Sequence, residues 1–347
     1  MSGRPRVPRP PGTDPDGILL TFPVAPEHAG MRLDRFIQSR IPRLSRTRAA
    51  QIVAGCAYRH DGRRRRPSDR VQANEVVVLV RPRFEEPEVP RHFGVVFEDE
   101  DVLAVDKPAG LPVHPTATYH RNTLTALLRE RYGDPPPHIA HRLDRETSGV
   151  LVCGKHPLAE RRLKVAFEKR RTGKRYLAIV RGAVRDDLDL IELPLGPARN
   201  GPHYLMEVRR AEGGSEARTR LAVRERQEDH TLVELAPETG RQHQLRVHLA
   251  AVGHPIVGDK MYGPEGVAPF LAYVEAGGVT TPELVERLGH DRHALHAFEL
   301  EVPHPRDGMP LRLAAPLAPD LRALWERLGR RKEPGSTRAR RTVASRP

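Results

Sequence analysis

Short apolar runs alternate with helical patterns over the first eighty residues. Residues 17–24 have the composition of a strand, and residues 31–41 carry apolar side chains at helical spacing with arginines on the opposite face. Ser45 is a favourable N-cap for a second helix, which is expected to end at Gly55. An Asp-Gly turn follows between short extended pieces, and residues 75–80 are a β run. The pattern predicts two helices and a hairpin in one small domain.

A longer succession of strands and helices begins at about Phe93. Two strands are expected within residues 94–115 and two within 217–240, with single strands in 148–155, 174–182, 293–305 and 309–317 and helices in 122–133, 157–170, 243–253 and 319–328. Helices are interspersed among these strands without a steady βαβ alternation. This arrangement predicts an α+β fold.

Composition divides the 347 residues into five segments. We expect a disordered Pro- and Arg-rich leader (1–16), a small domain (17–82), a Pro-rich linker (83–92), a large domain (93–328) and a basic, disordered tail (329–347). A chain of this length favours about two domains, in agreement with that division.

The formal net charge of +13 is unevenly distributed. Residues 31–70 hold twelve arginines and three aspartates and no other charged side chain, which leaves +9 in this one segment. Charge of one sign on a compact domain is typical of a surface that binds a phosphate backbone, so a nucleic acid is the expected partner. The alternative is a merely solvated charged face.

The two cysteines, Cys56 and Cys153, are too few for a disulfide framework or a zinc ribbon, and we expect both to be buried free thiols. Free thiols fit a reducing compartment, and the N-terminus lacks the apolar segment of a signal peptide. No apolar run approaches the ~18 residues of a membrane span. We expect a soluble, cytoplasmic monomer.

Motifs for nucleotide cofactors and metals are missing from the sequence. It has no P-loop, and its paired glycines lack the G-x-G-x-x-G context. The pairs His243/His248 and His293/His296 do not match H-E-x-x-H. We therefore expect no cofactor and no metal.

Asp144 stands close to Arg142, Arg145 and Glu146, directly before the apolar strand 148–155. A carboxylate beside guanidinium groups is held ionised, and an ionised, partly desolvated carboxylate can act as a nucleophile. The alternative is an Asp–Arg ion pair that closes a loop, and spacing alone favours this alternative.

A resemblance to a known family changes that balance. The stretch HRLDRETSGVLVCGK resembles the catalytic signature of the RluA family of RNA pseudouridine synthases. Four further blocks resemble that family in its own order: residues 96–115, 173–182, 239–263 and 292–300. The resemblance spans about residues 93–320 and implies the pseudouridine-synthase fold, a mainly antiparallel mixed sheet flanked by helices.

The resemblance also implies roles for individual residues. Asp144 matches the nucleophile, Tyr176 the tyrosine that packs against the target base, and Arg246 the basic residue that pairs with the aspartate. Arg142 matches an arginine that enters the RNA stack when the target nucleotide leaves it. The reaction detaches uracil, turns it and rejoins it through carbon five, which needs no cofactor.

The stretch RLDRFIQSRIPRLSRTRAAQIVAG with the later GRRRRPSDRV, within residues 32–71, resembles the alpha-L RNA-binding motif shared with a small-subunit ribosomal protein, although Arg-His-Asp-Gly replaces the usual turn. The arginines expected to contact RNA are Arg32, Arg35, Arg46, Arg48, Arg63, Arg64, Arg65 and Arg66, together with Arg241 in the larger domain. This motif favours ribosomal RNA as the substrate by family association.

Three alternatives differ in class. A transfer-RNA-directed synthase would share the whole active site. A noncatalytic RNA-binding or ribosome-assembly protein would tend to have lost Asp144, Tyr176 or Arg246, which are all present. A methyltransferase would need a glycine-rich donor loop, which the sequence lacks.

Overall fold

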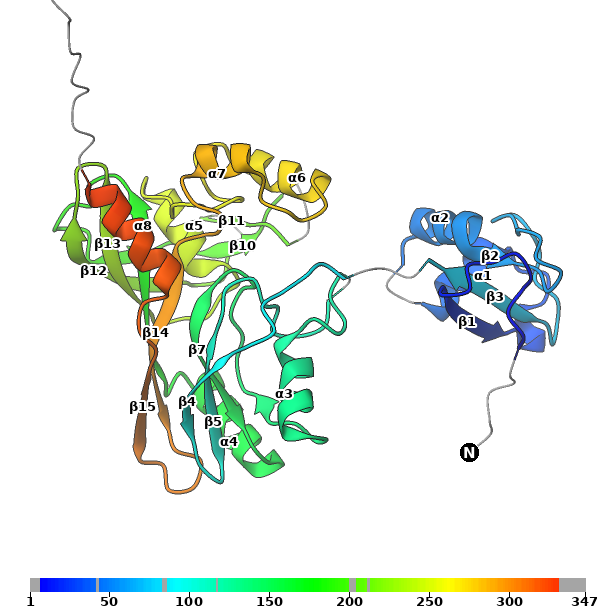
Figure 1. The fold of residues 1–347 in the computed structure, drawn as a ribbon, viewed down its shortest axis with the longest axis horizontal. Coiled ribbons are helices and arrows are strands. Elements are labelled where there is room, and N and C mark those ends of the chain that lie inside the picture. The colour runs from blue at the N-terminus through cyan, green and yellow to red at the C-terminus, as the bar shows by residue number, and fades with distance from the viewer. Residues whose placement is uncertain are drawn as a thin grey trace, which may run out of the picture. The chain divides into compact units, whose positions relative to one another are not determined.

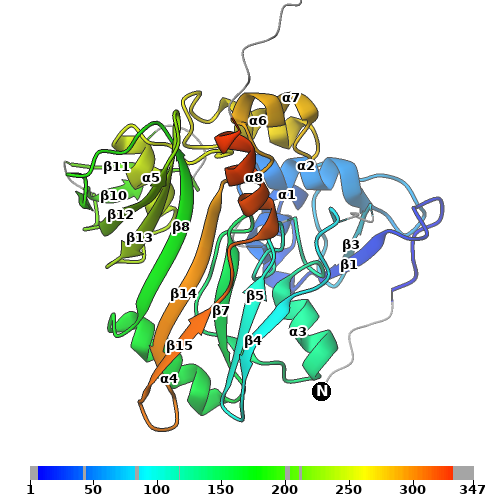
Figure 2. The same cartoon turned by 60° about the vertical axis from the view of Figure 1, so that its left-hand side comes forward.

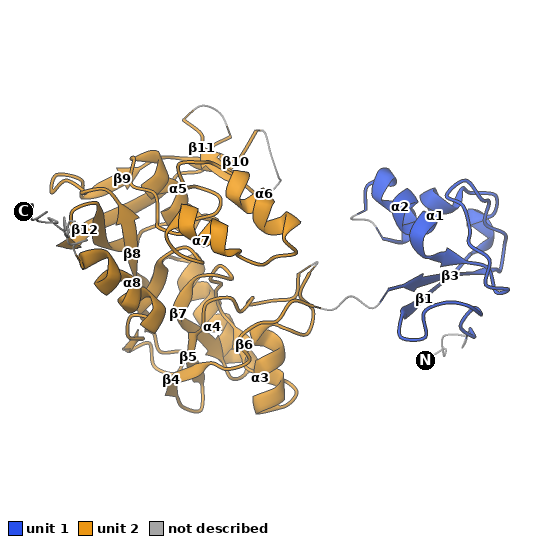
Figure 3. Cartoon of the chain, turned by 45° about the horizontal axis from the view of Figure 1, so that its top comes forward, with its two compact units in different colours: residues 1–85 blue, residues 86–347 orange. Residues whose placement is uncertain are grey.

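The computed structural model describes residues 7–41, 44–82, 86–116, 118–199, 204–210 and 213–330. The chain forms two compact units, residues 1–85 and residues 86–347 (Figure 3). The boundary between them falls inside the segment expected to be a linker.

The first unit is a three-stranded antiparallel sheet with two helices. Its elements are β1 (Ile18–Pro23), the 3-10 turn η1 (Pro26–His28), α1 (Leu33–Arg40), α2 (Arg46–Cys56), β2 (Ala57–Tyr58) and β3 (Val76–Arg81), with strand order β1-β3-β2. The Ser45 hydroxyl accepts a hydrogen bond from the Arg48 amide, which confirms the expected N-cap. Apolar residues of both helices and of β3 form the core of this unit.

Part of the expected disordered leader is ordered. Arg9 donates hydrogen bonds of 2.7 Å to the carbonyl oxygens of Asp14 and Gly17, and Pro10 is buried. Residues 7–16 therefore differ from the expectation, because the Arg9 guanidinium ties this segment to the start of β1. Residues 1–6 and 331–347 lie outside the described part of the chain.

The second unit is built on a ten-stranded sheet (Figures 1 and 2). Its strands are β4 (Gly94–Glu98), β5 (Val102–Lys107), β6 (His138–Ile139), β7 (Ser148–Gly154), β8 (Gly173–Arg181), β9 (Leu190–Glu192), β12 (Arg218–Arg226), β13 (His230–Pro237), β14 (Leu295–Pro303) and β15 (Pro310–Ala314). The order is β4-β5-β7-β14-β8-β13-β12-β9, with β6 on β7 and β15 on β14, and β10 (Leu195–Pro197) and β11 (Met206–Val208) form a separate pair. Only the β7–β14 pair of the described strands is parallel. The expected α+β fold with a mainly antiparallel mixed sheet is confirmed.

The helices of this unit are α3 (Leu124–Tyr132), α4 (Pro157–Glu168), α5 (Gln244–Ala251), α6 (Ala268–Glu275), α7 (Pro282–Leu288) and α8 (Pro319–Gly329). Helices α3 and α4 cover opposite faces of the sheet at β7, whereas α6 and α7 share a small apolar cluster of their own. In β7, Leu151 and Cys153 pack with α3, whereas Val150 and Val152 pack on the opposite side with Leu163 of α4. Because β7 is buried on both faces, it reads as a continuous apolar run.

The half of the sheet around β8 and β13 has its own core. Leu245 and Leu249 of α5 and Leu321 and Leu324 of α8 pack there with the strand residues. Tyr176 of β8 contacts both this core and the one under α3, so it marks the junction of the two halves.

Two further features differ from the expectations. In the second unit, helices α6 and α7 form where no helix was expected. Of the two free cysteines, Cys153 of the second unit is buried as expected, but Cys56 of the first unit is partly exposed. No helix among the described residues is long and apolar enough to cross a membrane.

Candidate active site

The loop before β7 presents Asp144 and is anchored on both sides of it. The Leu143 side chain is buried in the core under α3. The Arg145 carbonyl accepts hydrogen bonds from the fully buried Lys107 ammonium at 3.0 Å and from the Gly110 amide at 2.8 Å, and the Thr147 amide bonds to the Asp144 carbonyl. The backbone position of Asp144 is thereby set before any substrate arrives.

Gly149 allows the strand that follows this loop to pair with β14. Its φ is +112°, and a Cβ atom there would lie 2.1 Å from the Ala297 carbonyl oxygen. Only glycine combines this backbone conformation with so close an approach. The parallel register of His296 with Ser148 and of Ala297 with Gly149 therefore depends on it.

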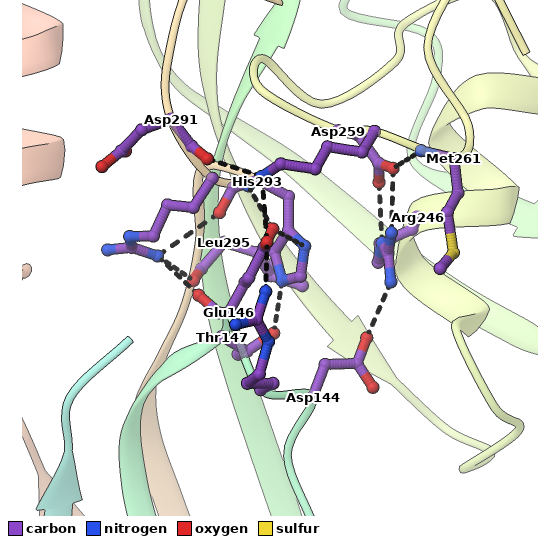
Figure 4. A network of polar contacts seen from close by, with 12 residues as sticks. Asp144, Glu146, Thr147, Arg246, Asp259, Met261, Asp291, His293 and Leu295 are labelled. Carbon is purple, nitrogen blue, oxygen red and sulfur yellow. Dashed lines mark hydrogen bonds and ion pairs between the residues drawn. The ribbon is translucent and has the colours of Figure 1, made fainter. Parts of the chain in front are cut away.

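Arg246 connects Asp144 to a second carboxylate (Figure 4). Its Nη1 donates to Asp144 Oδ2 at 3.1 Å, while Nε and Nη2 donate to the two oxygens of Asp259 at 2.7 and 2.9 Å. Asp259 is 1% exposed and also accepts from the amides of Met261 and Tyr262. The bidentate pair fixes the guanidinium plane, so Arg246 presents one N–H to Asp144 in a defined direction.

Asp144 is held ionised by this arrangement. Burial opposes ionisation, but the neighbouring positive charges and the hydrogen bond from Arg246 outweigh it and keep the pKa of the Asp144 carboxyl below its ordinary value. His243 contributes charge only when protonated, and burial together with Arg246 lowers its pKa to about 4. The cation hydrogen-bonded to Asp144 at neutral pH is therefore Arg246. With 24% of its side chain exposed, Asp144 remains accessible to a reactant.

Tyr176 lies in the middle of β8, opposite Ala297 of β14 and Leu235 of β13. Burial and the charge of Asp144 both raise the pKa of its phenol, so the ring is near Asp144 and keeps its proton at neutral pH. The structure thus gathers Asp144, Tyr176 and Arg246, from a loop, a strand and a helix, in one place.

Glu146 belongs to a polar network next to Asp144 (Figure 4), and Arg145 joins this network through a hydrogen bond to Glu146. Arg145 donates to Tyr119, Glu146 and, at 2.6 Å, Tyr273 of α6. Glu146 also binds the buried Lys260 at 2.9 Å. These contacts join the loop to α6 and to the segment after α5, so the charges have a structural role.

Arg142 and Arg241 are exposed. The charge of Arg142 is among those that lower the pKa of Asp144 and of His243, which places this guanidinium near the site. The Arg241 Nε donates to the Glu216 carbonyl. Both remain accessible to a phosphate.

The arginines of the first unit differ in exposure. Arg35, Arg46, Arg48, Arg63, Arg64 and Arg66 are exposed. Arg32 makes a bidentate pair with Asp34, and Arg65 is 8% exposed and bound to Glu75. Arg65 therefore stabilises the unit internally, and its burial argues against a phosphate contact.

Among the described residues, two clusters have the carboxylates and histidines of a metal site: Asp99, Asp101 and His304, and His290, Asp291 and Asp320. In the first, Asp101 already binds Arg306, and in the second the Nε and Nη2 of Arg292 donate to the two oxygens of Asp320. Because neighbouring cations neutralise these carboxylates, we propose no metal at either cluster.

Three residues of the site were not singled out for it from the sequence: His243, Asp259 and Tyr262. All lie in the block 239–263 that resembles the family, where the Gly-Asp pair and the histidine before α5 were the available signals. Their roles depend on contacts with Arg246 and Asp144, which the sequence pattern does not specify.

Comparison with known proteins finds relatives in one family. The sequence model of the RNA pseudouridylate synthase family matches residues 101–251. The ribosomal large subunit pseudouridine synthase D of Xanthomonas campestris is 34% identical over 322 residues, which is 90% of this chain and 93% of that protein. The ribosomal large subunit pseudouridine synthase C of Pasteurella multocida is 30% identical over 89% of this chain and 94% of its own length.

A solved structure shares the fold. Human RNA pseudouridylate synthase domain containing 1 superposes with a TM-score of 0.54 at 29% identity, and covers 69% of this chain and 90% of the human one. The fold, the Asp144–Arg246 pair and these similarities lead to one conclusion: the chain belongs to the RluA family of RNA pseudouridine synthases.

Proposed function

We propose that this pseudouridine synthase isomerises specific uridines of large-subunit ribosomal RNA and that Asp144 is its nucleophile. The observation that carries the catalytic part is the chain of contacts from Asp259 through Arg246 to Asp144. It keeps a partly exposed carboxylate ionised and oriented. The ribosomal target is supported by the names of the relatives from Xanthomonas campestris and Pasteurella multocida.

The chemistry is balanced without any co-reactant. The bond between ribose C1′ and uracil N1 breaks, and its electron pair stays on uracil. Uracil turns, C5 bonds to C1′, the C5 proton leaves and N1 gains a proton, so the product is an isomer of the substrate. Asp144 acts covalently or by stabilising the electron-deficient sugar, and its carboxylate is regenerated. Whether it attacks ribose or base first is left open.

Tyr176 would contact the extruded target base, and Arg142 would contact the RNA from which it has left. A rigid ring next to the nucleophile offers a stacking surface for the target base, typically worth ~1–3 kcal/mol. The exposed guanidinium of Arg142 would occupy the gap that the extruded nucleotide leaves in the base stack. Removing a base from a loop or bulge costs least, so an unpaired uridine is the expected target.

The first unit would bind the flanking RNA. Its exposed arginines (Arg35, Arg46, Arg48, Arg63, Arg64 and Arg66) suit phosphate contacts, with Arg241 as a further candidate on the catalytic unit. We also propose that the chain acts as a monomer without a small-molecule cofactor.

Mapping pseudouridine on defined RNAs tests the substrate. Unmodified large-subunit ribosomal RNA and a transfer RNA pool are incubated with the full chain or with its Asp144→Asn variant, and pseudouridines are located by chemical adduct and primer extension. New stops in ribosomal RNA that require Asp144 are expected. Stops confined to transfer RNA would overturn the ribosomal assignment, and a lack of stops in both would contradict the whole proposal.

A further inference from the structure

His243 has an unusual backbone conformation beside the nucleophile. It is the N-cap residue of α5, yet its φ is +54°, in the left-handed region that residues other than glycine seldom adopt. Its side chain is 10% exposed, and its Nε2 lies 3.9 Å from Asp144 Oδ2, which is too long for a hydrogen bond. Strained residues of this kind persist where the surroundings hold them and cluster at functional sites.

The ring is held from its other side by Tyr262. His243 Nδ1 lies 2.7 Å from the Tyr262 hydroxyl oxygen, which accepts a hydrogen bond from the Met206 amide at 3.0 Å. The Arg246 guanidinium in turn lies over the Tyr262 ring, with 5.0 Å between Arg246 Cζ and the ring centroid. The orientation of His243 is thus tied to the same guanidinium that orients Asp144.

These contacts determine where the imidazole proton lies. Burial raises the pKa of Tyr262 to about 12 and lowers that of His243 to about 4, so at neutral pH the phenol is protonated and the imidazole is neutral. Of the two groups that contact the Tyr262 hydroxyl within the described part of the chain, the Met206 amide is a donor, so His243 Nδ1 accepts the Tyr262 proton. With Nδ1 as the acceptor, the remaining proton of the neutral ring is on Nε2.

Electrostatics favour the same tautomer. A bare Nε2 lone pair would face the Asp144 carboxylate and be repelled by it, whereas an N–H bond is attracted. Among the described residues, His243 Nε2 has no hydrogen-bond partner within reach. The site therefore contains a neutral N–H donor that is oriented but unused, next to the carboxylate where the substrate must react.

We propose that His243 Nε2–H donates a hydrogen bond to a carbonyl oxygen, O2 or O4, of the target uracil and stabilises it as the glycosidic bond breaks. This inference rests on the proposed function. Reacting atoms approach a nucleophile to ~3–3.5 Å, so a uracil bound at Asp144 comes within reach of the His243 Nε2–H donor beside that carboxylate. The departing electron pair spreads onto O2 and O4, and a donor already in place stabilises that charge without reorganisation.

Thio-substituted RNA tests the contact. Single-turnover rates are measured for the full chain and for His243→Phe on RNAs that carry uridine, 2-thiouridine or 4-thiouridine at the mapped target, since sulfur accepts hydrogen bonds weakly. We expect His243→Phe to slow the uridine reaction by ~10²-fold, the usual effect of losing such a donor. We expect one of the two thio substitutions to slow the wild-type chain and to have little further effect on the variant.

Two further variants make the result decisive. Arg142→Ala should weaken RNA binding but leave the rate reduction caused by thio substitution unchanged. Tyr262→Phe removes the hydroxyl that binds Nδ1 and should make that rate reduction smaller, so it tests the contact even if His243→Phe does not fold. The inference would be overturned if, for both 2-thiouridine and 4-thiouridine, the rate reduction from thio substitution were as large in His243→Phe as in the wild-type chain. If the wild-type chain forms no pseudouridine from unsubstituted RNA, the proposed function itself fails, which is a separate outcome.

Discussion

Arg246 stands between two carboxylates, 3.1 Å from Asp144 on one side and paired through two hydrogen bonds with the buried Asp259 on the other. The pair with Asp259 engages Nε and Nη2, and Nη1 is the nitrogen that donates to Asp144. A guanidinium is suited to this task because its fork is planar and always charged, whereas a lysine ammonium cannot hold both partners in fixed directions.

Substitution of Arg246 separates its two roles. Arg246→Lys should reduce the single-turnover rate by ~10²-fold or more because Asp144 loses its oriented donor. Arg246→Met should in addition lower the free energy of unfolding by ~3–5 kcal/mol, because Asp259 is left as an unpaired buried charge. Denaturant titration and tritium release from 5-³H-uridine RNA measure the two effects.

The double variant Arg246→Met/Asp259→Asn is the matched control. It should recover much of the stability lost in Arg246→Met but none of the activity. Recovery of activity in the double variant would show that Arg246 acts only by neutralising Asp259.

A methyl group at Gly149 should break the junction between β7 and β14. Gly149→Ala combines a left-handed φ with a 2.1 Å approach to the Ala297 oxygen, and we expect a loss of about 3 kcal/mol or more. Gly94→Ala, in β4 of the same sheet, is the control, since its Cβ would have an ordinary 3.4 Å contact with the Asp106 side chain. Equal unfolding midpoints for the two variants would refute this account of Gly149.

The three groups at the centre of the site should not titrate near neutrality. In its proposed role Asp144 reacts as the carboxylate, and because its pKa is lowered, the ionised form is lost only as the pH falls through that lowered value. His243 stays neutral above its pKa of about 4, and Arg246 stays charged. The buried Lys107, which anchors the Asp144 loop, has its pKa lowered to about 7 by desolvation. We therefore expect a level single-turnover rate from about pH 6 down to about pH 5, and a midpoint near pH 7 for any loss of rate as the pH rises. A rate that falls as the pH drops from about 7 to about 5 would instead reveal an essential histidine that must be neutral.

Removal of the first unit should affect binding rather than chemistry. Deleting residues 1–85 takes away the exposed arginines of α1, of α2 and of the segment between β2 and β3. RNA affinity should therefore fall, and the slope of log affinity against log salt should become less steep. The rate at saturating RNA should change little. An unchanged salt slope, measured by filter binding at several salt concentrations, would show that this unit does not contact the phosphates.

The sequence predicted local elements well because their determinants are local. The cap at Ser45 and the continuous apolar run of β7 are visible in consecutive residues. Helices α6 and α7 were missed. Arg65 looked the same as its exposed neighbours in sequence, and only its contact with Glu75 separates it from them.

The site needed information from distant parts of the chain. Spacing alone favoured a loop ion pair for Asp144, and the resemblance of several blocks to one family identified Tyr176 and Arg246 as its partners. Asp259 contacts Arg246, and Tyr262 contacts His243. Side-chain contacts of this kind produce no periodic pattern in the sequence. Glu146 likewise finds Lys260 at a separation of 114 residues.

The most direct test of the nucleophile is Asp144→Asn, which preserves shape but removes the negative charge. Tritium release from 5-³H-uridine RNA is measured for this variant and for the wild-type chain. The surface control is Asp187→Asn, since Asp187 is an exposed carboxylate that pairs with Arg185. We predict no release above background for Asp144→Asn, with RNA binding nearly intact, and normal release for Asp187→Asn. Release by Asp144→Asn at the wild-type rate would contradict the assignment of Asp144 as the nucleophile.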